Sequence, residues 1–471
     1  MDPSILLGPL VGGLSHNSAN IWVRADAHAT MYVWIAIQAD GRDAELIGST
    51  ELLEQDGYAG ITALDGLTPE TKYHYAVSLT QDRPPGGEFH PFTTFPRPGT
   101  KRSFNFAIGS CYLPPDGNGG QTMDKLNQAI KSENLQFGMF LGDQIYADYA
   151  NRNGLDHPAV TLDDYRAVYE HAWSPTAMKQ LLPNLPWFMI LDDHEVDDDW
   201  RWRDSSRQSA DYSRMLKLKR WLKGSPPQHL HLTVERVRAA LKVYDEHQSM
   251  HAPDLLLPFR TDAKGEFIFH PHDPASLAYT FYYGNAAFFV LDTRTTRVGG
   301  RQRTMLGDGQ WHVLLQWLRQ VNDSYAVKFI VSSSSFLHPF WLDIAADRWS
   351  AFPAERERLL KFLAENEIEG VHILTGDLHS GHAVSAQLKC PGGRRLPIVE
   401  FCASPFEQRS VWLSFGYIPV FSRWLTRAKR HFYRAYPNFG IIQVNFDSPK
   451  PSVTFTLHYR AGEWKTSSIT V

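Results

Sequence analysis

The sequence predicts an α/β protein with a separate all-β domain at its N-terminus. Between Ile21 and Phe95, apolar residues recur with the period of β-strands, and clusters of Asp, Gly and Pro separate the runs. From Ser103 onward, compact apolar runs alternate with amphipathic helical stretches, which is typical of sheets built from β-α units. A chain of 471 residues also exceeds the size at which one hydrophobic core stops growing, so two domains are expected.

The first domain is assigned to residues 1–97 and the second to residues 98–471. Short β-branched and aromatic runs at this spacing favour a β-sandwich of roughly 90 residues. The stretch LDGLTPETKYHYAVSL, residues 64–79, resembles the loop and strand of a fibronectin type III-like domain. The turn-rich segment Pro96–Arg102 is interpreted as the linker.

Helical periodicity marks several segments of the second domain. Thr161 is placed as an N-cap with Asp164 three residues on, and Pro353 occupies a favourable first-turn position. Part of the basic segment from Trp200 to His251 also has a helical pattern. The expected helices are Gln121–Asn134, Thr161–Trp173, Ser213–Gly224, Asp308–Val321 and Pro353–Asn366.

Charge and cysteine content limit the classes of partner and compartment. The chain has 47 Lys and Arg against 51 Asp and Glu, a net charge of −4, so it has no chain-wide basic surface for nucleic acid. Three cysteines are an odd number, which disfavours a disulfide framework and fits a reducing compartment.

The N-terminal segment and the apolar runs predict neither a signal peptide nor a membrane span. The start, MDPSILLGPLVGG, lacks a basic region and a long apolar run. A cytoplasmic location is therefore expected, with secretion as the alternative if a leader has been trimmed. The longest apolar-aromatic stretch, Val411–Leu425, is interrupted by Gly416 and Pro419 and is too short for a span of about 18 to 20 residues.

Polar, ligand-type residues follow six apolar runs that are expected to be strands. Binding sites collect at the carboxyl ends of strands in β-α sheets, so these residues are expected to meet in one pocket. Carboxylates, imidazoles, a thiol and a phenol gathered together would repel or titrate unless bound cations neutralised them, which predicts two metal ions. The residues that follow the six runs are Ser110 and Cys111, Asp143, Asp192–Glu195, Asp292 and Arg294, Ser332–Ser335, and Asp377, His379 and His382.

The motifs GSC, GDQIY, DDHE, LDTRTTR and GDLH occur in that order and together resemble the alkaline phosphatase D family of metallophosphatases. This family lies within the calcineurin-like metallophosphoesterase superfamily. The resemblance extends from about Gly8 to the C-terminus. It implies a four-layer αββα catalytic domain with two central sheets, an iron(III) ion, and a divalent cation drawn from Ca, Mn, Zn or Mg.

The resemblance also implies a role for each matching residue. Asp143 would bridge two metals, and His194 would act as general acid or as a hydrogen-bond donor to the transition state. Asp193 stands where the superfamily motif GNHE has its asparagine. The implied metal ligands are Cys111, Asp143, Tyr146, Asp193, Asp292, Asp377 and His379, with Asp292 the weakest of them.

The implied reaction is hydrolysis of phosphate mono- or diesters by a metal-activated water. Arg294 or Arg297 would supply a cation for the phosphoryl oxygens, because a guanidinium fits them in a bidentate manner. After DDHE the family commonly has paired asparagines, whereas this chain has Asp197–Asp199. Asp199 is therefore a further ligand candidate.

Several residues near these motifs have simpler interpretations. Asp148 is interpreted as a helix-cap or loop carboxylate, and Cys390 and Cys402 as buried apolar residues. Asp192 and Glu195 are expected to support the ligands or form ion pairs, and His382 to be a strand histidine with a satisfied ring.

The basic and aromatic segment Phe421–Arg434 has two interpretations. The favoured interpretation is a solvated helix face. The alternative is contact with an anionic lipid surface, and in that case the substrate would be a phospholipid-type diester. A rival to the whole enzymatic interpretation is a non-catalytic protein that keeps its metals for stability and docks a partner through the β-sandwich.

Overall fold

The N-terminal domain contains two antiparallel sheets that share apolar contacts. The computed structural model describes residues 2–471 apart from 85–87, 116, 213, 223, 225–230, 270–272, 301–302, 338–346 and 410–420. One sheet has the order β1-β2-β5 and the other β4-β3-β6-β7. Their strands are β1 (Ile5–Gly12), β2 (Ser18–Ala25), β5 (Ala59–Asp65), β4 (Glu45–Leu52), β3 (Ala29–Ala36), β6 (Lys72–Ser78) and β7 (His90–Thr93).

Alternating apolar residues explain why these sheets face each other. Ile21 and Val23 of β2 are buried in the same cluster as Met31 and Val33 of β3. The sequence pattern found this region but missed β1, which precedes Ile21. The fibronectin type III-like assignment stays a prediction.

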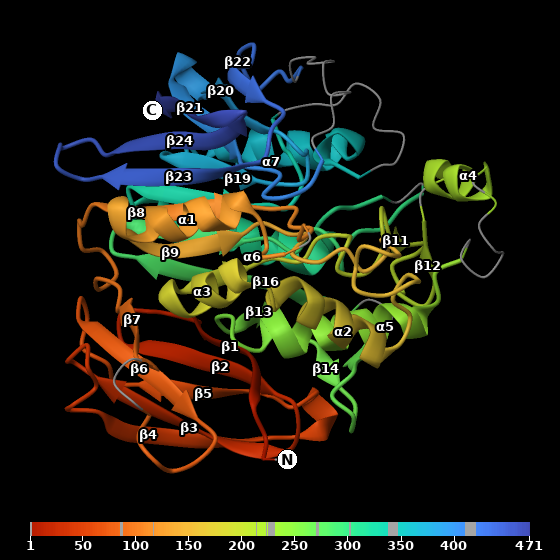
Figure 1. The fold of residues 1–471 in the computed structure, drawn as a ribbon. Helices are drawn as coiled ribbons and strands as arrows, with labels where there is room; N and C mark the ends of the chain where they lie inside the picture. Colours follow the sequence, from red (N-terminus) through yellow and green to blue (C-terminus); the bar gives the residue numbers. More distant parts are fainter. Residues whose placement is uncertain are drawn as a thin grey trace.

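Two larger sheets build the second domain (Figure 1). The six-stranded sheet has the order β10-β9-β8-β23-β24-β25, with β10 (Trp187–Met189), β9 (Leu135–Phe140), β8 (Phe104–Gly109), β23 (Asn438–Asn445), β24 (Ser452–Ala461) and β25 (Glu463–Thr470). The eight-stranded sheet has the order β13-β16-β17-β18-β19-β21-β20-β22, with β13 (Leu255–Leu257), β16 (Ser276–Tyr283), β17 (Ala286–Val290), β18 (Val327–Val331), β19 (Val371–Thr375), β21 (Arg395–Cys402), β20 (Gly381–Lys389) and β22 (Lys429–Arg434).

The six apolar runs singled out in the sequence all form strands. Three of these strands are parallel neighbours in the six-stranded sheet, and the other three are parallel neighbours in the eight-stranded sheet. β10, β9 and β8 lie side by side in the first sheet, and β17, β18 and β19 lie side by side in the second. Their buried faces account for the nearly continuous apolar sequences, since parallel strands are covered on both sides. The mixed α/β class is therefore confirmed.

The two large sheets pack face to face, with helices on their outer faces. Phe106 and Phe137 of the six-stranded sheet contact Phe288 of the eight-stranded sheet, with ring centroids 5.6 and 5.8 Å apart. Apolar residues of α1 and α3 lie in the cluster that covers the outer face of the first sheet, and those of α6 and α7 cover the second. The layers thus run helices, sheet, sheet, helices.

Each of the five expected segments contains a helix, whereas the helix at Thr176–Asn184 was not expected. Thr161 caps α2 and forms a reciprocal capping box with Asp164, and Pro353 lies in the first turn of α7. Helix α5 continues into a π-helical turn, Asp245–Ser249. The helices are α1 (Gln121–Ser132), α2 (Leu162–Trp173), α3 (Thr176–Asn184), α4 (Arg214–Leu222), α5 (Val234–Tyr244), α6 (Gly307–Asn322) and α7 (Pro353–Glu365).

Short elements complete the chain. Two small antiparallel ribbons pair β11 (Arg201–Trp202) with β12 (Ala210–Asp211) and β14 (Arg260–Thr261) with β15 (Phe267–Ile268). Single 3₁₀ turns are η1 (Glu54–Asp56), η5 (Trp349–Ala351) and η6 (Pro391–Gly393).

The segment Phe421–Arg434 is not a helix, so that expectation is wrong. Residues 429–434 form the edge strand β22, which pairs with β20, and Leu425 bridges to Leu388. The alternation of basic and aromatic residues fits a strand with one face on the sheet. Most of the apolar stretch Val411–Leu425 lies outside the described residues. Within the part that the structure describes, no helix combines the length and apolarity that a membrane crossing needs.

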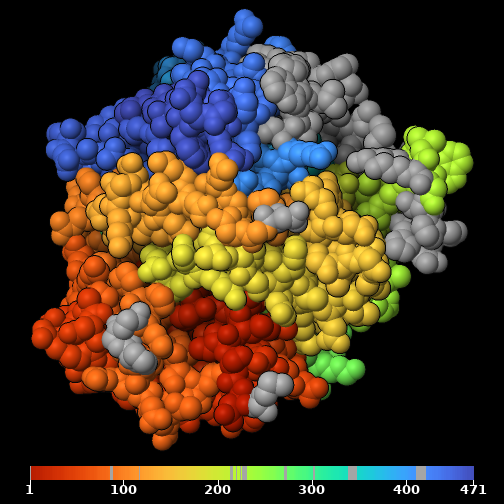
Figure 2. Space-filling view, viewed as in Figure 1, coloured from red at the N-terminus to blue at the C-terminus, as the bar shows by residue number. Residues whose placement is uncertain are grey.

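The junction between the two domains is packed. Phe95 is fully buried, with its ring centroid 4.8 Å from that of Tyr283 and 5.4 Å from that of Phe137. The amide of Gly99 donates to Gly284 O at 2.8 Å. The N-terminal domain therefore rests directly on the second domain, as the space-filling view also shows (Figure 2).

Phe137→Ala should lower the free energy of unfolding by about 3 to 5 kcal/mol, because it leaves a cavity between the two large sheets. Phe137 is fully buried and its ring contacts those of Phe106, Phe188 and Phe281. Urea unfolding followed by tryptophan fluorescence measures the change. Phe421→Ala is the matched control, because Phe421 is 83% exposed and its loss should change stability by less than about 0.5 kcal/mol. Equal effects of the two substitutions would contradict the described core.

Candidate metal centre

The loops that follow the parallel strands of both sheets meet at one edge of the sheet pair. Two backbone hydrogen bonds connect the loops after β8 and β9, from Cys111 N to Gly142 O at 3.2 Å and from Tyr112 N to Asp143 O at 2.7 Å. The amide of Asp377, which follows β19 of the other sheet, donates to the hydroxyl of Ser110 at 3.2 Å. Four of the residues there have positive φ angles that non-glycine residues rarely adopt, which is the strain often found at functional sites. They are Cys111 (60°), Asp143 (53°), Asp377 (63°) and His379 (48°).

Gly142, in the motif GDQIY, allows the loops to approach. Its φ is +99°, and a Cβ atom there would lie 2.5 Å from Cβ of Asp192. Only glycine accepts both this backbone conformation and this contact. The glycine therefore fixes where Asp143 begins its turn toward the site.

One group of donor atoms combines sulfur, oxygen and nitrogen. Cys111 Sγ lies 3.3 Å from Asp143 Oδ2, and the hydroxyl of Tyr146 lies 3.1 Å from His379 Nε2. The ligand atoms of Cys111, Asp143 and His379 all lie within 4.8 Å of one another. The structure thus brings together four sequence candidates from three strand ends, and their spacing is suited to a single ion.

Two further groups extend from the first in a line. Asp143 also lies close to Asp193 and His194, and Asp193 in turn lies close to Asp198 and Asp199, with the donor atoms of each group within 4.8 Å. Asp143 belongs to the first two groups and Asp193 to the last two. The carboxylates of Asp143 and Asp193 therefore link all three groups.

Asp148 has a specific partner, which corrects its interpretation as a cap or plain loop carboxylate. Its Oδ1 lies 2.6 Å from His194 Nδ1, and both side chains are buried. Burial by itself lowers the pKa of His194, but Asp148, Asp143 and Asp193 raise it well above its ordinary value. No local sequence pattern signals this pair, because the two residues are 46 positions apart.

The side chain of Glu195 supports the site by accepting hydrogen bonds from backbone amides of the neighbouring loops. Its carboxylate accepts hydrogen bonds from the amides of Asp143 (3.2 Å), Gln144 (2.7 Å) and Asp192 (2.9 Å). The loops after β9 and β10 are thereby held at a fixed separation. The expected supporting role of Glu195 agrees with these contacts.

The electrostatics of the first group favour a bound cation. Burial and the nearby carboxylates of Asp143 and Asp377 raise the pKa of Cys111 well above its ordinary value. Burial, with the charges of Cys111 and Asp143, does the same for Tyr146. Groups that cannot ionise together without compensation become ligands when a cation neutralises them, so the donors fit a metal centre.

A sequence comparison with known protein families is consistent with this geometry. The profile of the PhoD-like phosphatase family matches residues 106–455. The chain belongs to this family. A second profile, a domain of unknown function (DUF7800), matches residues 2–93.

Individual members of the PhoD-like phosphatase family and related structures extend the comparison. Alkaline phosphatase D of Bacillus subtilis (strain 168) is 28% identical over 353 residues, which cover 68% of this chain and 53% of that protein. The chain thus spans about half the length of this curated relative. The structure of PhoD superposes with a TM-score of 0.72 at 20% identity, covering 99% of this chain and 90% of that one. Purple acid phosphatase PPD1 from yellow lupin (Lupinus luteus) seeds has a similar fold, with a TM-score of 0.58 at 12% identity, covering 99% and 74%.

The two arginines of the motif LDTRTTR are buried and paired. Arg294 contacts Asp192 at 2.5 Å, Asp193 at 3.2 Å and Asp347 at 2.7 Å, and Arg297 contacts Asp347 at 2.9 Å. The guanidinium N–H groups of both arginines thus contact acceptors within the protein. The expectation that they meet phosphoryl oxygens is therefore revised: they neutralise the carboxylates behind the site. The contact to Arg294 agrees with the ion-pair role expected for Asp192.

Asp292 is also reassigned, because its oxygens are already used. Its carboxylate accepts hydrogen bonds from the amides of Leu277, Arg294 and Thr295, and from the hydroxyl of Thr295. It belongs to none of the candidate metal groups among the described residues. Asp292 shapes its loop and is not placed as a ligand.

Asp377 lies at the site but pairs with an arginine that the sequence analysis missed. Arg348 Nε is 2.9 Å from Asp377 Oδ2, and the side chain of Arg348 remains 19% exposed. Burial raises the pKa of Asp377 to about 8, although Arg348 opposes the shift.

The three acidic residues after DDHE have different surroundings. Asp197 forms ion pairs with Arg220 and Arg236, whereas Asp198 and Asp199 lie close to Asp193.

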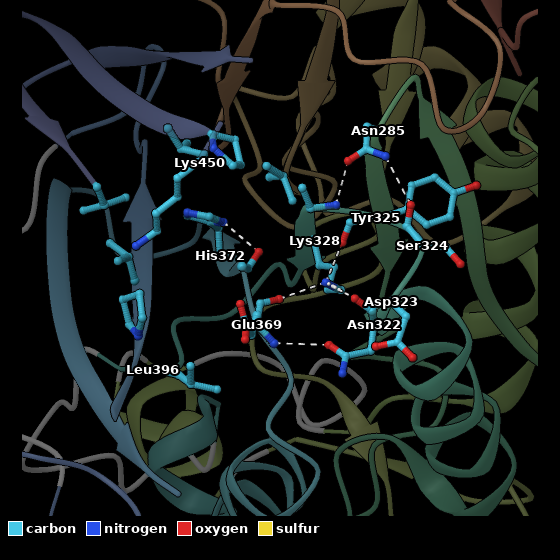
Figure 3. Close-up of a pocket in the computed structure, with 18 of the residues that line it drawn as sticks. Asn285, Asn322, Asp323, Ser324, Tyr325, Lys328, Glu369, His372, Leu396 and Lys450 are labelled. Atoms are coloured by element: carbon cyan, nitrogen blue, oxygen red, sulfur yellow. Dashed lines mark hydrogen bonds between the residues drawn. The ribbon is translucent and has the colours of Figure 1, made fainter. Parts of the chain in front are cut away.

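A large cavity lies elsewhere, at the opposite ends of the strands. It has a volume of about 790 Å³ and is lined by residues such as Asn285, Lys328, His372 and Lys450 (Figure 3). The ammonium of Lys328 donates to the carbonyls of Asn322, Tyr325 and Glu369 at 2.6 to 3.0 Å. All three of its protons are used, so Lys328 has none left for a ligand.

Asp148→Asn should lower the pKa of His194 in metal-depleted protein. Histidine-labelled NMR titration is expected to show wild-type His194 protonated above pH 6.5 and the variant titrating at lower pH. Because the folded-state pKa is raised, the charge of His194 contributes its full stabilisation below about pH 6.5, and this is lost as the pH rises through the folded pKa. The stability difference between the two proteins should therefore shrink in alkali. An unchanged titration would show that Asp148 does not set the charge of His194.

Proposed function

We propose that the protein is a metal-dependent phosphoesterase that hydrolyses phosphate mono- or diesters at a dinuclear site. The observation that carries the proposal is the line of donor groups that share Asp143 and Asp193. Membership of the PhoD-like phosphatase family supports it independently. Bound cations would supply Lewis-acid activation of water and charge stabilisation at phosphorus.

Each end of the line suits a different ion. Cys111, Tyr146 and His379 with Asp143 form a mixed set of donors, in which the phenolic and carboxylate oxygens suit iron(III). Asp193, with Asp198 and Asp199, forms an oxygen-rich set for a divalent cation such as Ca, Mn, Zn or Mg. In this proposal Asp143 belongs to both ions.

His194 is proposed as the group that donates a proton, or a hydrogen bond, to the leaving oxygen. Asp148 holds Nδ1, which fixes the ring and leaves Nε2 for the substrate. The backbone amide of His194 also donates to Asp143 Oδ1 at 3.3 Å, which places the ring next to the shared carboxylate. A phosphoryl group bound at the metals would then lie within its reach.

The domain boundary near residue 97 is part of the same proposal. The two family profiles leave a gap between residues 93 and 106 that contains this boundary, which supports domains 1–97 and 98–471. The substrate class is to be found by assay of phosphomonoesters, phosphodiesters and phospholipid vesicles in parallel.

Asp143→Asn should abolish or strongly reduce metal content, because Asp143 is the carboxylate common to two donor groups. Elemental analysis of protein purified without chelator is expected to give two metals per wild-type chain, iron among them. Asp292→Asn is the matched control: it alters a buried carboxylate that is hydrogen-bonded within its loop, and metals should be retained. Metal-free wild-type protein that cannot be reconstituted would refute the metal centre.

His194→Ala should lower the hydrolysis rate by about 10²- to 10⁴-fold while the metals remain bound. The reason is that its proposed task is proton donation and not ligation. Hydrolysis of p-nitrophenyl phosphate and of bis(p-nitrophenyl) phosphate, alongside metal analysis, checks both parts. Wild-type rates in the variant would contradict this role for His194, whereas a metal-loaded wild type that hydrolyses neither ester would favour the non-catalytic binding protein.

A further inference from the structure

Gln144 of the motif GDQIY has no task in the proposed chemistry, yet it is buried beside the shared carboxylate. Its amide nitrogen Nε2 donates to Gln248 Oε1 at 2.6 Å, and Gln248 Nε2 donates to the hydroxyl of Tyr169 at 2.9 Å. All three side chains are buried. Buried amides are fixed when they bond to each other, so Gln248 constrains the residue next to Asp143.

The constraint continues from Gln144 to the carboxylate of Glu195. The backbone amide of Gln144 donates to Glu195 Oε1, while the other oxygen, Oε2, accepts from the amides of Asp143 and Asp192. A shift of Gln144 would therefore change how Asp143 is presented. Each contact in this path has a heavy-atom distance of 3.2 Å or less.

Gln248 lies in the π-helical turn Asp245–Ser249, and the same turn holds the N-terminal domain. The indole nitrogen of Trp22, in β2, donates to Glu246 O at 2.8 Å. The Trp22 ring also packs against His247 and His251, with centroid distances of 5.8 and 6.2 Å. The turn thus contacts the N-terminal domain through the backbone carbonyl of Glu246 and contacts the site through the side chain of Gln248.

The N-terminal domain is shaped to fit this turn. A Cβ atom on Gly12 would lie 2.2 Å from His251 Nδ1, and one on Gly57 would lie 2.7 Å from Glu246 Oε2. The two glycines thus let β1 and the loop after η1 reach the turn.

Ion pairs fix the turn within the second domain and also connect the adjoining helix α5 to the N-terminal domain. Arg166 binds both carboxylate oxygens of Glu246 at 2.7 and 2.8 Å, and Lys242 pairs with Asp56 of the N-terminal domain at 2.7 Å. The contact is therefore specific, and includes more than general apolar packing.

We propose that the N-terminal domain positions the metal centre through this π-helical turn, with Trp22 and Gln248 as positioning residues. This inference rests on the proposed metal site and assigns a role to the domain of unknown function. The domain would hold the turn through Trp22, the turn would hold Gln144 through Gln248, and Gln144 with Glu195 would hold Asp143. Without the contacts to the N-terminal domain, the second domain would keep its fold, but its metal-binding residues would be held less rigidly.

The test uses the full chain, with Mn²⁺ alone as the probe of the site. Metal-depleted wild type, Gln248→Leu, Trp22→Phe and Tyr75→Phe are titrated with Mn²⁺, and hydrogen exchange of the amides at 142–146 is followed without metal. Tyr75→Phe is the matched control, because it removes a hydrogen bond across the same domain contact, from the Tyr75 hydroxyl to Pro183 O at 3.1 Å, that leads to α3 and away from the site.

Gln248→Leu is expected to weaken Mn²⁺ binding by about 10-fold and to speed exchange at Asp143 and Gln144, as loss of a residue that orients ligands does. Trp22→Phe should act in the same direction with a smaller effect, and Tyr75→Phe should leave both measurements at wild-type values. Equal effects of Trp22→Phe and Tyr75→Phe, or no effect of Gln248→Leu, would overturn the proposal.

A second variant separates positioning from stability. In Gln144→Leu/Gln248→Leu both amide partners are replaced, so no buried amide is left unpaired and thermal stability should recover toward wild type. Mn²⁺ affinity should stay low if the path positions Asp143, whereas recovery of affinity along with stability would overturn it. Absence of Mn²⁺ binding by wild type would instead refute the proposed metal site itself.

Discussion

The confinement of several carboxylates in one buried pocket is the constraint on which the rest of the structure depends. An unpaired buried charge costs several kcal/mol, so each carboxylate needs a partner. Arg294 serves Asp192, Asp193 and Asp347, and Arg236 serves Asp197. Asp143 has instead the thiol of Cys111 and the phenol of Tyr146 beside it, and because burial raises the pKa of both groups, they keep their protons until a cation displaces them. The centre is therefore built so that a metal is the missing charge.

This arrangement explains which parts of the site the sequence predicts. Strand ends and motifs identify the candidates Cys111, Asp143, Tyr146, Asp193, His194 and His379. These residues come soon after apolar runs, so the neighbouring sequence is sufficient to find them. The partners that decide their behaviour come from distant segments. Asp148 and Arg348 follow no strand, and their roles depend on how loops fold back. The same limit applies to Asp292, Arg294 and Arg297, since a motif gives position along the chain but not which oxygens and nitrogens are already bonded.

The fold shows the same division between local and tertiary information. Capping at Thr161 and the buried parallel strands were predicted because propensity and period act over a few residues. The segment Lys429–Arg434 is a strand because β20 offers it a free edge, which no pattern within the segment reveals. The π-helical turn after α5 was not predicted either, and it depends on contacts with Trp22, a residue more than 220 positions earlier.

The position of β23 has a consequence for how the protein is made. β8, which leads to Cys111, lies between β9 and β23, so one of its two neighbours comes from residues 438–445. During synthesis the thiol-bearing strand has an open edge until nearly the whole chain has left the ribosome. The candidate metal centre is thus assembled late, and a nascent chain presents the thiol of Cys111 before β23 is available to pair with β8.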